Sequence, residues 1–193
     1  MGRHDRLNVG SMGDRKMGDD ELLTTRLSLR RPTRRDIEMI LSVHSDPRTC
    51  IDNPSDALAT REEAERLFER WDDHWRRFGF GYWVARRRGS ETPVGFCGIK
   101  TMQLKDENVL NLFYRFHPSA WGCGLASEAA AAVVRWAARQ LPDYPLIARV
   151  RPQNVASQRV ATRAGLIRAE HLDGPGYDGF DWIYKSESGP ELC

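Results

Sequence analysis

The residues between Phe116 and Ser127 have the types and spacing of a phosphate-binding turn. An alternating apolar stretch ends at Phe116, and Gly122, Gly124 and Ala126 stand where an alanine-rich helix begins. Backbone N–H groups at the start of a helix have no partner within it and lie at the positive end of the helix dipole. Small residues also allow a ligand to approach that backbone closely. This segment therefore predicts binding of a ligand that carries a pyrophosphate.

Four further side chains have types that can take part in catalysis. Asn154 and Ser157 have the spacing of a helix N-cap and the third residue of its helix, which is also their ordinary structural role. His117 can titrate near neutral pH, although we favour a strand-end histidine packed on Pro118. Cys123, at a helix start, is expected to be a small loop residue rather than a nucleophile activated by His117.

The composition is that of an ordinary globular domain. The chain has 193 residues, of which 40% are hydrophobic and 29% charged, and its formal net charge is +2. This charge gives no argument for nucleic-acid binding, and the four cysteines lack the spacing of a zinc site. We expect reduced thiols, no metal and a cytoplasmic protein without membrane contact. The N-terminus has no apolar signal region, and no apolar run has the roughly 18 residues that cross a membrane.

Hydrophobic periodicity and turn residues divide the chain into strands and helices. Two capping boxes, Thr33-x-x-Asp36 and Thr60-x-x-Glu63, predict helix starts, and Gly79 predicts the end of the second helix. Strands are expected at residues 27–31, 82–87, 94–99, 109–116, 146–150, 166–170 and 180–185, and later helices at 127–140 and 154–165. This order predicts a mixed α/β or α+β domain.

Two other phosphate-binding motifs compete for the glycine turn. A Walker A loop is excluded because no lysine follows the glycines. A Rossmann turn fits in part, with Ser127 at the position of the third glycine and Asp143 roughly 20 residues beyond the turn. It would make the chain an NAD(P)-dependent oxidoreductase domain. A Rossmann unit usually begins its domain, whereas this turn follows several strands and helices, so we keep this interpretation as an alternative.

The chain resembles the GNAT superfamily of N-acetyltransferases. The pyrophosphate loop of that family has the form Gln/Arg-x-x-Gly-x-Gly/Ala. Residues 121–126 match it at the glycine and the final alanine, with Trp121 in place of Gln or Arg. Segments 25–30 and 154–166 resemble the opening strand and a later signature of the branch that includes ribosomal-protein N-terminal acetyltransferases. The three matches occur in order and cover about residues 22–185.

The resemblance implies a mostly antiparallel mixed sheet flanked by helices, with two middle strands that splay apart. These strands correspond to residues 109–116 and 146–150, and the pantetheine of acetyl-CoA is expected between them. Exposed backbone at Phe116 and His117 is expected to pair with pantetheine and to help polarise the thioester carbonyl. Asn154 is expected to be a further anchor for the cofactor. The loop residues expected to bind the cofactor are Trp121, Gly122, Cys123, Gly124, Leu125, Ala126 and Ser127.

The implied reaction is direct attack of a neutral amine on the acetyl thioester in a ternary complex. Asn154 is expected to anchor pantetheine or substrate, and Ser157 to donate a hydrogen bond to the departing sulfur. Many family members carry a tyrosine as general acid where this chain has Ala161. A domain that binds CoA without catalysis therefore remains an alternative. The general base also stays open, with water, His117, Asp178, Asp181 and Glu170 as candidates.

The favoured acceptor is a peptide or protein α-amine, on the resemblance alone, with a small-molecule amine as the alternative. The aromatic segment 71–83 corresponds to a region that lines the acceptor groove, where Asp72 and Asp73 can receive a cationic amine. We nevertheless favour core packing for at least one of its tryptophans. The sequence leaves open whether the protein forms a homodimer. The expected organisation is a disordered extension at residues 1–21, the acetyltransferase domain at 22–185 and a tail at 186–193.

Overall fold

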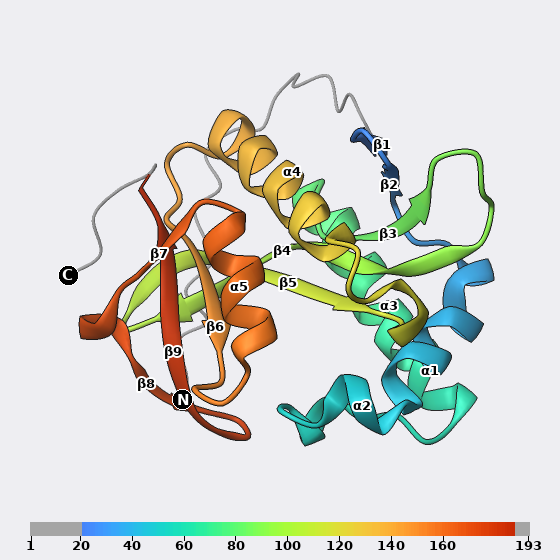
Figure 1. Ribbon diagram of the computed structural model, residues 1–193, viewed down its shortest axis with the longest axis horizontal. Coiled ribbons are helices and arrows are strands. Elements are labelled where there is room, and N and C mark those ends of the chain that lie inside the picture. Colours follow the sequence, from blue (N-terminus) through green and yellow to red (C-terminus); the bar gives the residue numbers. More distant parts are fainter. Residues whose placement is uncertain (1–20, 188–193) are drawn as a thin grey trace.

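The structure, a computed structural model, describes residues 21–187, which form a nine-stranded sheet with helices on both faces (Figure 1). The strands are β1 (Glu21–Leu23), β2 (Leu27–Arg30), β3 (Tyr82–Arg87), β4 (Pro93–Leu104), β5 (Glu107–Phe116), β6 (Leu146–Val150), β7 (Leu166–Arg168), β8 (Gly174–Gly176) and β9 (Gly179–Ser186). The helices are α1 (Ile37–Ser45), α2 (Pro47–Cys50), α3 (Arg61–Phe78), α4 (Leu125–Gln140) and α5 (Val155–Arg163). Short 3-10 turns are η1 (Arg34–Asp36), η2 (Pro54–Asp56), η3 (Pro118–Ala120) and η4 (Glu170–Leu172).

The sheet is antiparallel except at its centre. Its strand order is β1-β2-β3-β4-β5-β6-β9-β7, and β8 pairs with β9. Among the described strands, only β5 and β6 run parallel, and they pair at two positions, Leu110 with Leu146 and Asn111 with Ile147. Beyond these pairs the two strands diverge (Figure 1). The predicted fold class, a mixed and mostly antiparallel sheet with splayed middle strands, is confirmed.

Helix α3 forms where the sequence predicts it. Thr60 and Glu63 make the reciprocal bonds of a capping box at the start of α3, and Gly79 ends the helix with a φ of +74°. Trp71 and Trp75 lie one turn apart on its inner side, and each is only 4% exposed. Core packing of these tryptophans is therefore confirmed.

Two separate cores hold helices to the two faces. On one face, α1 and α3 pack on β3 and β4, with the Trp71 ring centroid 5.1 Å from that of Phe96 and 5.3 Å from that of Tyr82. On the other face, α4 packs on β4 and β5 through a stripe of small apolar residues, while α5 packs on α4, β6 and β7. This stripe consists of Leu125, Ala129, Ala130, Val133 and Ala137. Small side chains let α4 lie close to the sheet beside the glycine turn.

The structure corrects several predicted boundaries. The segment between Pro47 and Pro54, to which no helix or strand is assigned above, contains α2 and begins η2. The β4–β5 hairpin is longer than expected because its polar end continues the ladder to Leu104 and Glu107. β1 and β8 were not predicted, since three-residue strands give too short a pattern. The predicted extension and tail lie mostly outside the described residues.

Gly98 shows how closely β3 and β4 approach. A Cβ atom at Gly98 would lie 2.5 Å from the Cα of Tyr82 and closer still to the carbonyl oxygen of Gly81. We expect Gly98→Ala to lower the free energy of unfolding by about 1–3 kcal/mol, because backbone atoms must move apart. Denaturant unfolding measures this change. Gly174→Ala is the matched control, since no heavy atom lies within 4 Å of its added Cβ; equal losses in both variants would contradict the expectation.

Candidate active site

The divergence of β5 from β6 leaves backbone groups of β5 facing an opening. The His117 N–H donates to the Val94 carbonyl at 2.9 Å, and the His117 carbonyl accepts from the Ala120 N–H at 2.9 Å. Backbone groups alternate in direction along an antiparallel ladder. The N–H and C=O groups of Tyr114 and Phe116 therefore point away from β4, toward the opening. The His117 N–H and C=O groups are thus already paired, and the backbone groups that face the opening belong to Tyr114 and Phe116.

The turn after β5 presents the start of α4. The indole Nε1 of Trp121 donates to the carbonyl of Phe116 at 2.8 Å, and Gly122 and Gly124 adopt φ values of +77° and +76°. Glycine adopts this left-handed conformation without steric cost. The N–H of Glu128 donates to the carbonyl of Gly124 at 3.1 Å and closes the first turn of α4. Three N–H groups before it have no partner within the helix, those of Leu125, Ala126 and Ser127.

Two arginines lie against this turn. Arg26 forms an ion pair with Glu128 at 2.5 Å, and its Nη1 donates to the carbonyl of Cys123 at 2.8 Å. Arg87 places its Nη2 3.7 Å from the Cys123 Sγ, while that thiol donates to the carbonyl of Ala120 at 3.1 Å. These contacts fix the turn against β2 and β3. They also bring positive charge next to the unpaired N–H groups, as a phosphate site requires.

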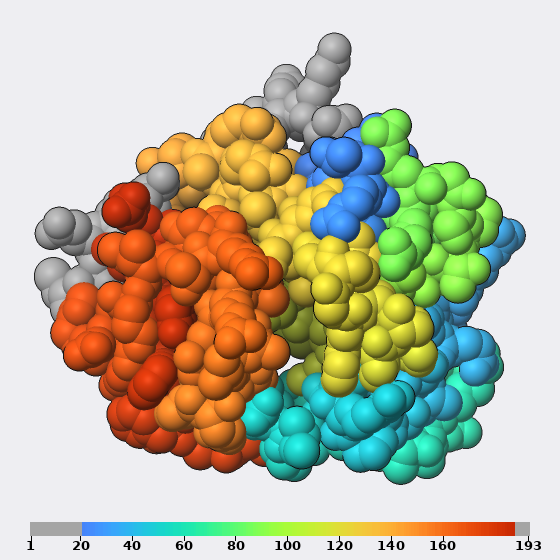
Figure 2. Space-filling model, viewed as in Figure 1, coloured from blue at the N-terminus to red at the C-terminus, as the bar shows by residue number. Residues whose placement is uncertain are grey.

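A cavity of about 420 Å³ connects the two faces of the sheet at the opening. Phe113 of β5 packs with the core on the α1–α3 side, and Tyr114 packs with the core on the α4–α5 side, yet both line this cavity. Ser157 lines it from α5. Figure 2 shows a hollow where the cyan segment around α2, the yellow end of β5 and the orange region of α5 meet. Ligands bound on opposite faces can therefore meet here.

Tyr114 and Ser157 form a hydrogen-bonded pair at the cavity wall. The Tyr114 hydroxyl donates to the Ser157 carbonyl at 2.7 Å, and the Ser157 Oγ donates to the Tyr114 oxygen at 2.8 Å. Asn154 Oδ1 accepts from the Ser157 N–H at 2.8 Å and so caps α5. Burial raises the pKa of Tyr114, although its bond with Ser157 opposes this change. Both hydroxyls therefore carry their protons at neutral pH.

The carboxylates that line the cavity already have partners. The contacts are Asp56 to Arg115 at 2.7 Å, Asp181 to Arg151 at 2.8 Å, and Asp178 to Ser55 at 2.7 Å. Two of the predicted base candidates, Asp178 and Asp181, are therefore engaged in the structure of the cavity. The third, Glu170, lies in η4 and does not line the cavity.

Comparison with known proteins assigns this architecture. The family model "Acetyltransferase (GNAT) domain" matches residues 26–167. The chain belongs to this GNAT family. It is 25% identical to an acetyltransferase from Agrobacterium tumefaciens str. C58, with a TM-score of 0.75 over 92% of this chain and 100% of that chain. The predictions of a GNAT fold and of an N-acetyltransferase are confirmed.

More distant GNAT structures share the fold. RimL, a ribosomal L7/L12 α-N-protein acetyltransferase in complex with coenzyme A, has 17% identity and a TM-score of 0.66 over 85% of this chain and 95% of that chain. A spermidine N-acetyltransferase from Vibrio cholerae in complex with CoA and spermine has 13% identity and a TM-score of 0.65 over 84% and 94%. At these identities the likeness concerns the fold alone.

A curated relative adds a partial match. The chain is 32% identical over 89 residues to the uncharacterized protein YkkB of Bacillus subtilis (strain 168). The match covers 46% of this chain and 52% of YkkB, so the chain spans about half the length of this relative. The match does not identify a substrate.

Several predicted candidates lie apart from the GNAT cavity. His117 bonds the Ser119 hydroxyl at 2.8 Å, whereas Cys123 bonds Ala120, so the structure does not bring these two side chains together as a nucleophile and its base. Asp72 pairs with Arg31 at 2.7 Å instead of facing the cavity. Because the described strands contain one parallel pair, the sheet is not the doubly wound sheet of the Rossmann alternative.

The GNAT position that often carries a tyrosine is filled by Ala161, which is fully buried in the core between α5 and the sheet. A phenol reaches the cavity from another element, as Tyr114 of β5. Tyr114 was not among the predicted site residues, because the position expected to carry the acid lies on α5. Strand alternation places Tyr114 on the α5 side, but its bond with Ser157 depends on how the helix packs.

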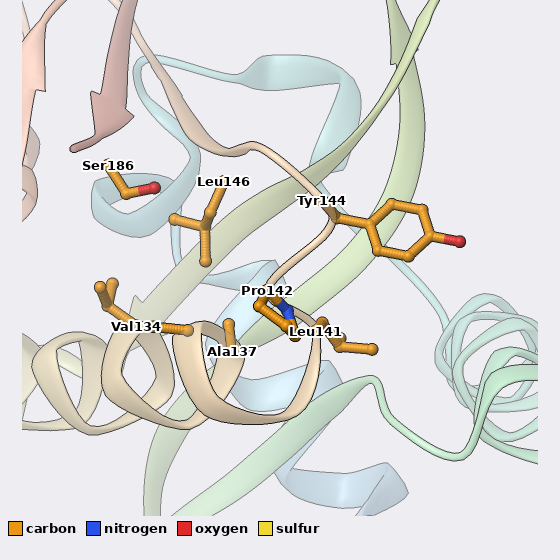
Figure 3. Close-up of a pocket in the computed structure, with 8 residues that line it drawn as sticks. Val134, Ala137, Leu141, Pro142, Tyr144, Leu146 and Ser186 are labelled. Carbon is orange, nitrogen blue, oxygen red and sulfur yellow. The ribbon is translucent and has the colours of Figure 1, made fainter. Parts of the chain in front are cut away.

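A second, smaller cavity lies away from this site. It measures about 50 Å³ between the C-terminal end of α4 and β6, where Val134 and Ala137 lie near Leu146 and Ser186 (Figure 3). None of the described helices is long and apolar enough to span a membrane. Residues 21–187 also contain no cluster of three metal-ligating His, Cys, Asp or Glu side chains.

His44 of α1 contributes a neutral ring to the main cavity. It is 2% exposed, its Nδ1 lies 2.9 Å from the Ile40 carbonyl, and its ring stacks on Phe113. Burial, helped by the nearby Arg115, lowers the pKa of His44 from 6.5 to about 4. The imidazole is therefore uncharged at neutral pH.

This shift makes stability depend on pH. Between pH 6.5 and 4 the unfolded chain binds a proton that the folded His44 does not, so folding weakens as the pH falls. At pH 5 this difference in protonation lowers the free energy of unfolding by about 2 kcal/mol. We expect His44→Leu to reduce the loss of unfolding free energy between pH 7 and pH 5 by about that amount, measured by denaturant unfolding. His171→Leu, at an exposed position, should leave the loss unchanged; an unchanged loss in His44→Leu would contradict the expectation.

Proposed function

We propose that this protein transfers the acetyl group of acetyl-CoA to the α-amine of a peptide or protein by direct attack, with residues 22–185 as the catalytic domain. The cavity through the opening between β5 and β6 carries this proposal. It gives the thioester and the amine a common cavity, with the hydrogen-bonded hydroxyls of Tyr114 and Ser157 in its wall. The α-amine specificity of RimL, which shares the fold, is consistent with this acceptor class.

The residues at the opening fit acetyl-CoA, which supplies an activated acetyl group as a thioester. The N–H groups of residues 122–127 would hold the pyrophosphate, with Arg26 and Arg87 beside them. The backbone of Tyr114 and Phe116 offers hydrogen-bonding groups to the amides of pantetheine. The carbonyl of Phe116 already accepts from Trp121 and keeps one lone pair.

Ser157 is proposed to donate a hydrogen bond to the departing sulfur. The Tyr114 oxygen lies 2.8 Å from the Ser157 Oγ, so the Tyr114 hydroxyl can donate a hydrogen bond to Ser157 when Ser157 turns toward the sulfur. Tyr114 thereby supplies the phenol that is absent at Ala161. Asn154 positions Ser157 through the N-cap bond. His117 has no part in this scheme because its ring is bound to Ser119.

The cavity favours an acceptor that is easily deprotonated. No lining carboxylate is free to act as a strong base, and the neighbouring arginines favour the neutral form of an amine. A peptide α-amine has a pKa near 8, roughly two units below that of a lysine side chain. Water can accept its proton at physiological pH. This argument favours α-amines over alkylamines.

The glycine turn gives the first test. We expect Gly124→Val to weaken acetyl-CoA binding at least about tenfold, because a β-branched residue resists the left-handed conformation and blocks the approach to the N–H groups. Thermal-shift titration with acetyl-CoA, and with NAD for comparison, measures this effect. Gly89→Val is the matched control, since Gly89 has the same φ of +76° in the β3–β4 turn. Equal weakening of acetyl-CoA binding in both variants would contradict the assignment of the glycine turn as the pyrophosphate-binding loop.

The hydroxyl pair gives the second test. We expect Ser157→Ala to lower kcat roughly 100-fold and Tyr114→Phe to lower it less, with small changes in acetyl-CoA affinity, because both hydroxyls act as the thiolate leaves. CoA release with a serine-initiated peptide measures kcat. Equal losses in kcat and affinity would make Ser157 a binding residue. In the same assay Cys123→Ala should retain turnover; its loss with acetyl-CoA binding intact would refute direct attack.

A further inference from the structure

We propose that the acceptor is an anionic amine, an α-amine with a carboxylate close to it in the same molecule. A free acidic amino acid and a peptide with an acidic second residue share this chemistry. The inference rests on the proposed function, because it concerns the amine that the GNAT cavity receives. It is carried by unpaired polar groups on β4, β5 and α3 that face the cavity.

Positive charge exceeds negative charge in the lining of the cavity. The cations are Arg70, Lys100, Arg115, Arg149 and Arg151, and the carboxylates are Asp56, Asp178 and Asp181. Arg115 pairs with Asp56, while Arg149 and Arg151 pair with Asp181. Within residues 21–187, the side chains of Arg70 and Lys100 form no ion pair and donate no hydrogen bond. These two cations are therefore available to a ligand.

Lys100 and Arg70 act on each other across the cavity. Burial lowers the pKa of the Lys100 amine, and the charge of Arg70 lowers it further, while Asp56 opposes the effect. The ammonium also lies 5.7 Å from the centroid of the Tyr82 ring. The repulsion between these two like charges outweighs the attraction of Asp56 for Lys100. An anion between them removes this repulsion and forms charge-assisted hydrogen bonds.

Asn111 supplies a hydrogen-bond acceptor next to Lys100. The β4–β5 register pairs Lys100 directly with Asn111, so their side chains leave the same face of the sheet as neighbours. Asn111 Oδ1 is buried and has no hydrogen-bond partner in the described part of the chain. An amine N–H can satisfy this oxygen while a carboxylate of the same molecule binds Lys100. Asn111 also belongs to the last β5–β6 pair, at the edge of the opening.

The same arrangement disfavours a polyamine. A second ammonium would need a free carboxylate, and each carboxylate of the lining is held by an arginine or by Ser55. Arg70 and Lys100 would instead repel it. The cavity thus selects against extra positive charge on the acceptor as well as for negative charge.

The test compares acceptors that differ by one charge. The peptide amides Ser-Asp-Ala-Ala, Ser-Asn-Ala-Ala and Ser-Lys-Ala-Ala are assayed for CoA release with the full chain, beside free aspartate, free asparagine and spermidine. We expect kcat/KM for the Asp peptide to exceed that for the Asn peptide at least about tenfold, with the Lys peptide and spermidine lowest. The comparison of aspartate with asparagine shows whether the free amino acid is also accepted.

Variants of Lys100 and Arg70 test whether these two side chains cause the preference for the Asp peptide. Lys100→Met should bring the Asp-to-Asn ratio close to one, and Lys100→Arg should preserve it. Lys105→Met is the control, because Lys105 donates to the His171 carbonyl at 2.6 Å and does not line the cavity. Arg70→Gln, at an exposed position of α3, provides a second variant if Lys100→Met lowers the melting temperature.

Two results would overturn the inference: equal kcat/KM for the Asp and Asn peptides, or an unchanged ratio in folded Lys100→Met and Arg70→Gln. Absence of turnover with every amine, despite acetyl-CoA binding, would refute the proposed function instead. In that case the inference is tested by binding: the peptides are titrated calorimetrically into the protein in the presence of CoA, and their affinities are compared. Binding of the Asp peptide at least about tenfold tighter than the Asn peptide supports it, and equal binding rejects it.

Discussion

The parallel contact between β5 and β6 lasts for two residue pairs, and the arrangement of the site follows from where it ends. Backbone polar groups removed from water need hydrogen-bond partners. Past Asn111 and Ile147 the strands diverge, so the inner edge of β5 depends on solvent or a ligand for those partners. Residues 117–124 join this edge to the start of α4, where three N–H groups also lack helical partners. One short stretch of chain therefore carries two consecutive sets of unsatisfied backbone groups.

Tyr114 couples this open edge to the opposite helix. Its backbone belongs to the unpaired edge of β5, and its side chain binds Ser157 in the first turn of α5. That turn is fixed by the Asn154 cap, while the buried Ala161 allows α5 to approach the sheet. The position of the Ser157 hydroxyl thus depends on strand direction, helix capping and core packing together. Replacement of a core side chain of α5 would displace it without contact to either substrate.

Sequence could predict the parts of this site that local chemistry determines. The Thr60–Glu63 capping box and the glycine turn have patterns set by neighbouring residues. The cavity could not be predicted in this way, because its lining comes from α1, η2 and its flanking residues, α3, β3 to β6, α5, the β8–β9 turn and β9. The direction of the His117 backbone depends on the register with β4, which no local pattern reveals. Lys100 gave no signal either, since its unpaired state depends on where distant carboxylates find their partners.

Charge distribution links acceptor choice to the missing base. A GNAT cavity with a free carboxylate can bind an ammonium and then take its proton. Here arginines or Ser55 hold the lining carboxylates, and the low pKa of His44 makes its ring a weak base. Surplus cations instead favour the uncharged amine. The neutral amine still needs to be held, and a carboxylate carried by the acceptor can bind those cations without restoring the proton. Anion recognition and deprotonation by water are then two consequences of one electrostatic field.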